Sequence, residues 1–120
     1  VGAVRSKFPD LKLSLHLHDT RGMGIANAYA GLTMGVDTYD AAVAGLGGCP
    51  FAAHKGAAGN VCTEDLVFMC DEMGIETGID LDALLAAAIV AEDVVGHPLP
   101  GSVKSGGTLK AMREKLRVQH

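Results

Sequence analysis

Two histidines, His16 and His18, are separated by a single residue in a stretch where every second residue from 11 to 17 is leucine. This period of two predicts a β-strand over residues 11–18, with both imidazoles on its polar face, roughly 7 Å apart along the backbone. Imidazoles that leave one face can bind the same cation, and ordinary partly buried histidines are the alternative. The alternation turns Asp19 to the other face, so we expect it to cap the strand end or orient a neighbouring group.

A cysteine, Cys49, lies in the segment Gly-Leu-Gly-Gly-Cys-Pro at residues 45–50. Glycines allow the backbone to approach a ligand closely, and an exposed thiol of low pKa can act as a nucleophile or as an acid/base. The commoner role of cysteine is that of a small buried apolar residue. That role suits Cys62, beside a helix start, and Cys70, at helical spacing from other apolar residues, so Cys49 is the candidate catalytic residue.

Asn60 follows Gly59 at the end of the same glycine-rich loop. Its amide oxygen is a hard ligand of the kind that Mg²⁺ and Mn²⁺ accept, although an asparagine here can also serve only the turn. Histidine, histidine and asparagine together indicate an open octahedral site with room for substrate, not a tetrahedral structural zinc site. His54 and Lys55, inside the loop, are interpreted as solvated residues, with contact to an acidic substrate as the alternative.

The elements that must position these residues predict an α/β fold. We expect helices over 22–34, 64–73 and 81–95 and from residue 108, a second strand over 36–44, and a connection without regular structure over 97–107. The order strand, helix, strand predicts a parallel pair with a right-handed crossover. Two parallel strands cannot bury both faces of a sheet, so further strands are expected from a longer parent chain or from partner subunits. The start at Val1, inside what looks like the end of a helix, indicates the same.

The composition is that of one globular domain. The chain has 120 residues, 48% of them apolar, and a formal net charge of −4. Its basic residues form no continuous block, and no apolar run reaches the length of a membrane span, so neither nucleic acid nor membrane is an expected partner. Three cysteines without regular spacing and the lack of a leader pattern favour a reducing, cytoplasmic setting.

Three segments closely resemble the C-terminal part of the 3-hydroxy-3-methylglutaryl-CoA lyase family. These are Leu-His-Leu-His-Asp-Thr-Arg-Gly at 15–22, Val-Ala-Gly-Leu-Gly-Gly-Cys-Pro-Phe-Ala at 43–52 and Gly-Asn-Val-Cys-Thr-Glu-Asp-Leu-Val-Phe at 59–68. The resemblance implies the last two βα units of a TIM (β/α)8 barrel, followed by additional helices. Within a partial domain over 1–120 it implies a metal-site strand at 11–18, a catalytic loop at 45–60 and C-terminal helices at 63–117.

The same resemblance implies the site and its reaction. His16, His18 and Asn60 would bind a divalent cation, Mg²⁺ or Mn²⁺, and Cys49 would act in acid/base catalysis. The implied reaction cleaves 3-hydroxy-3-methylglutaryl-CoA, or a close 3-hydroxyacyl-CoA, to acetyl-CoA and acetoacetate. The implied partners are the acyl-CoA substrate and either further copies of the chain or the missing part of the barrel.

Departures from the family pattern leave alternatives open. The family's aspartate ligand and neighbouring arginine of the first barrel strand, and a catalytic aspartate of the strand before the histidines, lie outside this chain. The stretch between Cys49 and Asn60 is longer than the family's, and Arg21 stands where studied members carry an aromatic residue. A related barrel aldolase or acyl-CoA-dependent synthase is one alternative, and an inactive self-associating fragment is another.

Overall fold

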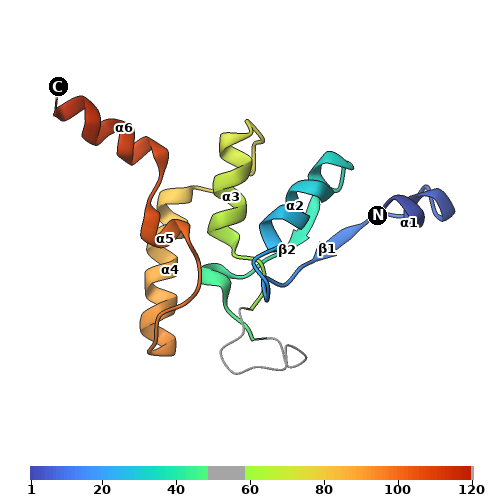
Figure 1. Cartoon of the computed structure of the whole chain (residues 1–120), viewed down its shortest axis with the longest axis horizontal. Helices are drawn as coiled ribbons and strands as arrows, with labels where there is room; N and C mark the ends of the chain where they lie inside the picture. The colour runs from blue at the N-terminus through green and yellow to red at the C-terminus, as the bar shows by residue number, and fades with distance from the viewer. Residues whose placement is uncertain (49–58, 120) are drawn as a thin grey trace.

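The structure is a computed structural model that describes residues 1–48 and 59–119. Its elements are, in chain order, α1 (Gly2–Lys7), β1 (Ser14–His16), α2 (Gly24–Thr33), β2 (Thr38–Asp40), the 3-10 turn η1 (Val43–Gly45), α3 (Thr63–Glu72), α4 (Leu81–Val95), α5 (Val103–Gly106) and α6 (Leu109–Val118). The fold is elongated, at 55 × 36 × 21 Å, with its two ends far apart (Figure 1). Its radius of gyration of 16.0 Å exceeds the value of about 13.6 Å typical of a compact domain of this length.

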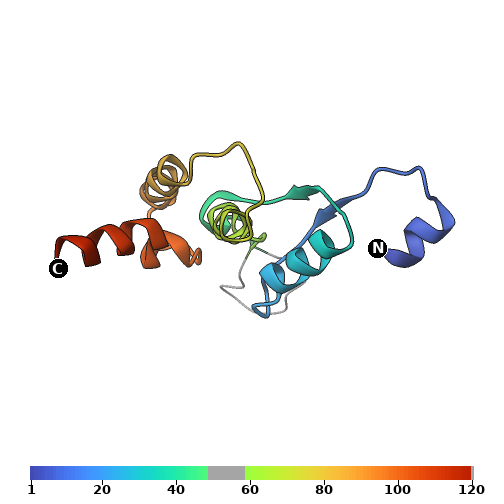
Figure 2. The same ribbon diagram turned by 90° about the horizontal axis from the view of Figure 1, so that it is seen from above.

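A parallel strand pair forms the centre of the first half of the chain. β1 pairs with β2 in the register Ser14 to Thr38, Leu15 to Tyr39 and His16 to Asp40. The crossover helix α2 lies along this pair (Figure 2). At Gly31, a Cβ atom would lie 2.5 Å from Leu15 Cδ1 and 2.7 Å from the Tyr39 hydroxyl, so glycine lets α2 approach the sheet closely.

Two apolar clusters hold the helices together. Ala28 of α2 packs with Leu66 and Cys70 of α3, and Ala44, Ala88 and Leu99 join η1, α4 and the segment after it. Expected helix ends are confirmed at Asp80, whose carboxylate accepts from Ala83 N at 3.2 Å, and at Gly96, which ends α4 with φ +77°. α2 and α3 thus pack together beside the strand pair, whereas α4 packs against η1, which follows β2.

Several element boundaries differ from those expected. β1 spans Ser14–His16 and not 11–18, because β2 offers backbone partners to these three residues. The strand expected over 36–44 is β2 at Thr38–Asp40, followed by η1, whose Ala44 has φ +57° and cannot continue a strand. α3 begins at Thr63 itself, with no side-chain cap from that residue. The connection expected over 97–107 contains the short helix α5.

The prediction of an α/β fold with parallel strands and C-terminal helices is confirmed. Within residues 1–48 and 59–119, each helix is too short or too polar to cross a membrane.

Candidate active site

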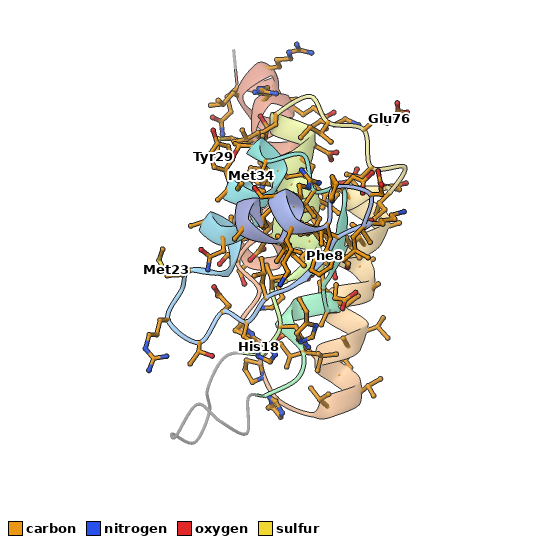
Figure 3. All side chains as sticks on the ribbon, turned by 90° about the vertical axis from the view of Figure 1, so that its right-hand side faces the viewer. Phe8, His18, Met23, Tyr29, Met34 and Glu76 are labelled. Atoms are coloured by element: carbon orange, nitrogen blue, oxygen red, sulfur yellow. The ribbon has the colours of Figure 1, made fainter. Side chains whose placement is uncertain are left out.

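The two histidines converge where β1 ends. His16 Nε2 and His18 Nε2 lie 3.2 Å apart, with ring centroids separated by 5.1 Å and planes inclined at 61°. The leucine alternation produces this convergence, because it holds the apolar side chains against α2 and directs both imidazoles to the opposite face. Figure 3 shows His18 at the end of the fold remote from Glu76. Two cis ligands of one cation, each about 2.1 Å from it, would lie about 3.0 Å apart, so the observed spacing suits a shared ion.

Asn60 lies opposite His18 on a neighbouring stretch of backbone. The two residues form an antiparallel bridge in which Asp19 N donates to Gly59 O at 3.0 Å and Val61 N donates to Leu17 O at 2.9 Å. In this arrangement His18 and Asn60 are a non-hydrogen-bonded pair, whose side chains leave the same face close together. The Asn60 amide nitrogen donates to Leu46 O at 3.2 Å, which leaves its amide oxygen free to act as a ligand.

Asp40, on β2, contacts the outer edge of the His16 ring. Its Oδ2 lies 3.3 Å from His16 Nδ1, and the two side chains are 66% and 57% exposed, respectively. A carboxylate can only accept, so this contact favours the His16 tautomer that carries its proton on Nδ1. The lone pair of that ring is then on Nε2, the atom that faces His18.

The glycine-rich segment beside Asn60 is held by a buried carboxylate. Glu64 has no exposed surface, and its two oxygens accept from Ala44 N at 2.8 and 3.0 Å. Gly101 N donates to Ala44 O at 3.1 Å, so both backbone polar groups of this left-handed residue are satisfied by distant parts of the chain. Where Gly59 passes Gly47, a Cβ atom would lie 1.5 Å from Gly47 O, so only glycine fits there.

Cys49, His54 and Lys55 lie outside the described residues, as does most of the predicted catalytic loop 45–60. The described ends of that loop are brought to the histidine pair, because Asn60 N donates to Leu46 O at 3.4 Å and Asn60 pairs with His18. Cys49 follows Gly48 directly in the chain. The role of Cys49 therefore stays a prediction, and so does its place beside the imidazoles.

Asp19 serves the backbone and not the histidine pair. Its Oδ1 accepts from Gly24 N at 2.9 Å, at the first residue of α2. A Cβ atom at position 24 would lie 3.0 Å from that oxygen. Of the two roles expected for Asp19, strand-end cap and orienter of a neighbouring group, the structure shows the second, and the group is the first residue of α2.

The other two cysteines are structural, as expected. Cys62 and Cys70 are each 6% exposed. Burial, followed by the hydrogen bond with Glu64, raises the pKa of the Cys62 thiol far above its usual range, and burial also raises the pKa of Cys70. Both shifts disfavour the thiolate, which is the reactive form of cysteine.

The burial of Cys62 and Cys70 predicts that they react more slowly with a thiol reagent than Cys49 does. With a disulfide reagent at mildly alkaline pH, we expect the native chain to show a fast phase from Cys49 and slow phases from Cys62 and Cys70. The Cys49→Ser variant should lose the fast phase and keep the slow ones, whereas all three thiols should react quickly in denaturant. A fast phase that persists in Cys49→Ser would contradict the assignment of Cys49 as the exposed, reactive thiol.

The residues present suit a divalent cation, although no three His, Cys, Asp or Glu side chains cluster as a metal site in the described part of the chain. The donors are instead two imidazole nitrogens 3.2 Å apart and an amide oxygen. His18 Nδ1 is buried without a partner among the described residues, while Nε2 of the same ring faces the site. Two imidazoles and one amide leave coordination positions for further ligands, which is the open arrangement expected of a catalytic site.

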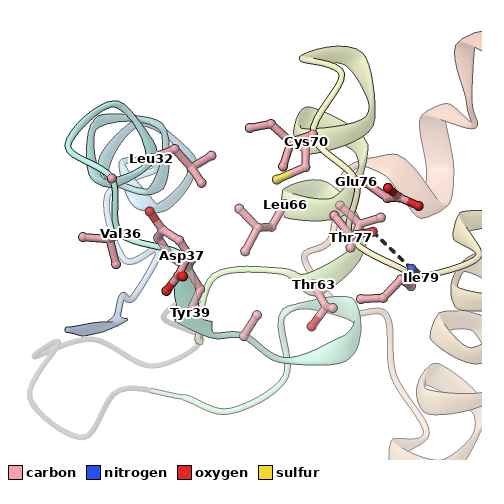
Figure 4. Close-up of a pocket in the computed structure, with 14 residues that line it drawn as sticks. Leu32, Val36, Asp37, Tyr39, Thr63, Leu66, Cys70, Glu76, Thr77 and Ile79 are labelled. Atoms are coloured by element: carbon pink, nitrogen blue, oxygen red, sulfur yellow. Dashed lines mark hydrogen bonds between the residues drawn. The ribbon is translucent and has the colours of Figure 1, made fainter. Parts of the chain in front are cut away.

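One hollow of the described residues lies away from the histidine pair. A cavity of about 510 Å³ is lined by residues of α2, β2, α3 and the loop that follows α3, among them Val36, Leu66, Cys70 and Ile79 (Figure 4). Its lining includes neither His16 nor His18, whereas barrel enzymes place their sites at the C-terminal ends of the strands. We therefore assign the candidate site to the histidine pair and not to this cavity.

Sequence reasoning missed two contributors to the site. Asp40 could have been found from the expected parallel pairing, because its register partner is His16. Glu64 is the first residue of the helix expected over 64–73, and no role in the site was predicted for it. Its contact with Ala44, twenty residues earlier, has no local signal in the sequence.

A parallel strand–helix–strand unit with imidazoles at the C-terminal end of its first strand is the arrangement expected of one repeat of a (β/α)8 barrel. The model of the HMGL-like family matches residues 1–90, and the chain belongs to that family. It is 45% identical to (R)-citramalyl-CoA lyase of Chloroflexus aurantiacus, over 87% of this chain and 32% of that protein. It is also 45% identical to hydroxymethylglutaryl-CoA lyase of Bacillus subtilis, over 82% of this chain and 32% of that protein.

Solved structures agree with this membership. An HMG-CoA lyase from Acinetobacter baumannii, in complex with coenzyme A and 3-methylmalate, superposes with a TM-score of 0.78 at 47% identity, covering 88% of this chain and 34% of that one. The hydroxymethylglutaryl-CoA lyase from Pseudomonas aeruginosa gives a TM-score of 0.79 at 40% identity, covering 95% and 36%. The chain thus spans about a third of the length of the relatives it matches, and the expected barrel class is confirmed.

Proposed function

We propose that this chain supplies the metal-binding strand and the catalytic loop of a carbon–carbon lyase that cleaves a 3-hydroxyacyl-CoA. The observation that carries the proposal is the 3.2 Å separation of the two imidazole Nε2 atoms, with Asn60 paired opposite His18. His16, His18 and Asn60 would hold a divalent cation, Mg²⁺ or Mn²⁺. When bound, such a cation supplies Lewis-acid stabilisation of negative charge on substrate oxygens.

Residues of the chain itself would supply the proton and position the loop. Cys49 would donate its thiol proton to the carbon of the departing acetyl-CoA enolate, the acid step that such a cleavage requires. Glu64 holds Ala44 and thereby the glycine-rich segment that leads to Cys49. The Asn60 amide nitrogen donates to Leu46 O, and this hydrogen bond directs the Asn60 oxygen away from the loop backbone. Holding residues 45–48 in place would limit the positions from which the thiol can reach the substrate carbon.

Two acyl-CoA compounds are proposed as substrates. The relatives' names support either 3-hydroxy-3-methylglutaryl-CoA, cleaved to acetyl-CoA and acetoacetate, or (R)-citramalyl-CoA. Arg21, which is exposed beyond the histidine strand, stands where an aromatic residue was expected and adds a cation at this edge. We propose 3-hydroxy-3-methylglutaryl-CoA as the first substrate to test and (R)-citramalyl-CoA as the second. We also propose that the protein is cytoplasmic. Its partners would be further copies of the chain or the rest of a barrel.

A segment exchange tests this function. We would replace the matched third of the Bacillus subtilis relative with this chain and assay acetyl-CoA release from both acyl-CoA substrates, with Mg²⁺ or Mn²⁺ and after chelation. We expect cleavage that needs the cation and that falls about 10²–10⁴-fold in Cys49→Ser, the range typical of a lost acid/base group. Cys70→Ala, which alters a thiol packed against α2, should retain activity.

Two results would count against the proposal. A well-folded hybrid that cleaves neither substrate would refute the lyase assignment, and undiminished turnover in Cys49→Ser would favour the related aldolase or synthase chemistry. The alternative of an inactive, self-associating fragment predicts that the chain alone elutes as an oligomer and binds Mn²⁺ weakly during size-exclusion chromatography. A monomer that binds Mn²⁺ tightly would contradict that alternative.

A further inference from the structure

Asp40 lies where it can control the proton of one of the two imidazoles. The β1–β2 register places it directly beside His16, and its Oδ2 accepts from His16 Nδ1 at 3.3 Å. A neutral imidazole carries one proton, so a proton held on Nδ1 leaves the lone pair on Nε2. That Nε2 is the atom 3.2 Å from His18 Nε2.

Neighbouring carboxylates are engaged in other contacts. Asp19 accepts from Gly24 N at 2.9 Å, and Asp37, three residues before Asp40, accepts from the Thr38 hydroxyl at 3.0 Å. His18 has no comparable acceptor among the described residues, since its Nδ1 is buried without a partner. The geometry therefore distinguishes the two imidazoles, and it gives Asp40 a function that Asp37 does not share.

We propose that Asp40 is a positioning residue that keeps His16 in the tautomer whose Nε2 can bind a divalent cation. This inference rests on the proposed function, because it assigns a role toward the same cation site. A carboxylate that accepts from the far nitrogen of a metal-binding histidine fixes the ring orientation and increases the basicity of the ligating nitrogen. Asp40 does this from the adjacent strand, so the parallel pairing itself is part of the site.

The first measurement needs no metal. In the metal-free chain with ¹⁵N-labelled histidine, NMR shifts report which ring nitrogen of His16 carries the proton. We expect the Nδ1–H form in the wild-type chain and in Asp37→Ala, and a shift toward the Nε2–H form in Asp40→Ala. Asp37 and Asp40 are both exposed, so neither substitution removes core packing, and equal far-UV circular dichroism would confirm equal folding. An Nε2–H form of His16 in the wild-type chain would overturn the proposal.

The second measurement is a Co²⁺ titration by calorimetry and visible absorption. Asp40→Ala should weaken Co²⁺ binding by about 10–100-fold, the usual effect of losing such an outer partner, whereas Asp37→Ala should leave it unchanged. Equal Co²⁺ affinity in Asp40→Ala and Asp37→Ala would overturn the role of Asp40 while leaving the metal site intact. The Asp40→Ala substitution could instead change the His16 tautomer while the wild-type chain binds no Co²⁺. That result would refute the metal site, and with it the cation part of this proposal.

Discussion

Glu64→Ala is expected to lower the free energy of unfolding of the chain by about 2–4 kcal/mol. The substitution leaves the Ala44 N–H buried without an acceptor, which costs about 1–3 kcal/mol, and it adds a cavity where a fully buried side chain was. Both carboxylate oxygens accept from that N–H, at 2.8 and 3.0 Å, and the described residues offer it no other acceptor. Urea unfolding followed by circular dichroism measures the loss.

Two variants make this expectation specific. Glu64→Gln keeps the size and one acceptor oxygen, so we expect it to cost about 1 kcal/mol, the net value of a typical hydrogen bond. Glu72→Ala changes a carboxylate at the exposed end of the same helix and should stay within about 0.5 kcal/mol of the wild-type chain. If Glu64→Ala unfolds at the same urea concentration as Glu72→Ala, the contact with Ala44 does not stabilise the loop.

Local periodicity was sufficient for one part of the site. Every second residue from 11 to 17 is leucine, and this pattern alone placed His16 and His18 on one face. The structure brings their Nε2 atoms within 3.2 Å because the leucine face is anchored against α2. Prediction from sequence succeeds here because the period of a strand requires no knowledge of distant residues.

Distant contacts explain what could not be predicted. A strand was expected through Ala44, but its N–H is taken by Glu64 and its carbonyl by Gly101, and the backbone turns into a left-handed conformation. Both partners come from parts of the chain that no local pattern connects with residue 44. Asn60 meets His18 only through an antiparallel bridge formed across the glycine-rich loop, so the residues alone left it as a possible turn residue.

The helices after α3 also include starts that the local sequence predicts and one that depends on a distant residue. The caps at Asp80 and Thr108 follow from residues next to the helices they begin, and the structure confirms both, with Ala111 N donating to Thr108 at 3.1 Å. The segment between these helices was expected to be irregular, yet Asp65 accepts from Ser102 N and Val103 N and begins α5 there. A carboxylate thirty-seven residues earlier in the chain thus supplies the helix start that the local sequence lacks.

His16→Ala and His18→Ala are expected to have the largest effect on metal binding, reducing Co²⁺ affinity by more than about 100-fold. The loss of a ligand should exceed the effect of losing an outer partner, which is about 10–100-fold at most. With one imidazole removed, the described donors of the site are a single ring nitrogen and the Asn60 amide. The titration used for Asp40 measures both variants, with visible absorption to report loss of nitrogen coordination.

His97→Ala provides the matched control, because His97 lies beyond α4 and its ring contacts the carbonyl of Pro98 at 3.0 Å and not the site. It should bind Co²⁺ as the wild-type chain does. Retained affinity in His16→Ala together with loss in His97→Ala would place the cation elsewhere. Weak binding in both site variants is the result expected if the two imidazoles bind one ion, which their 3.2 Å separation allows. The loss in the double variant should then differ from the sum of the two single losses, because ligands of a shared ion are coupled.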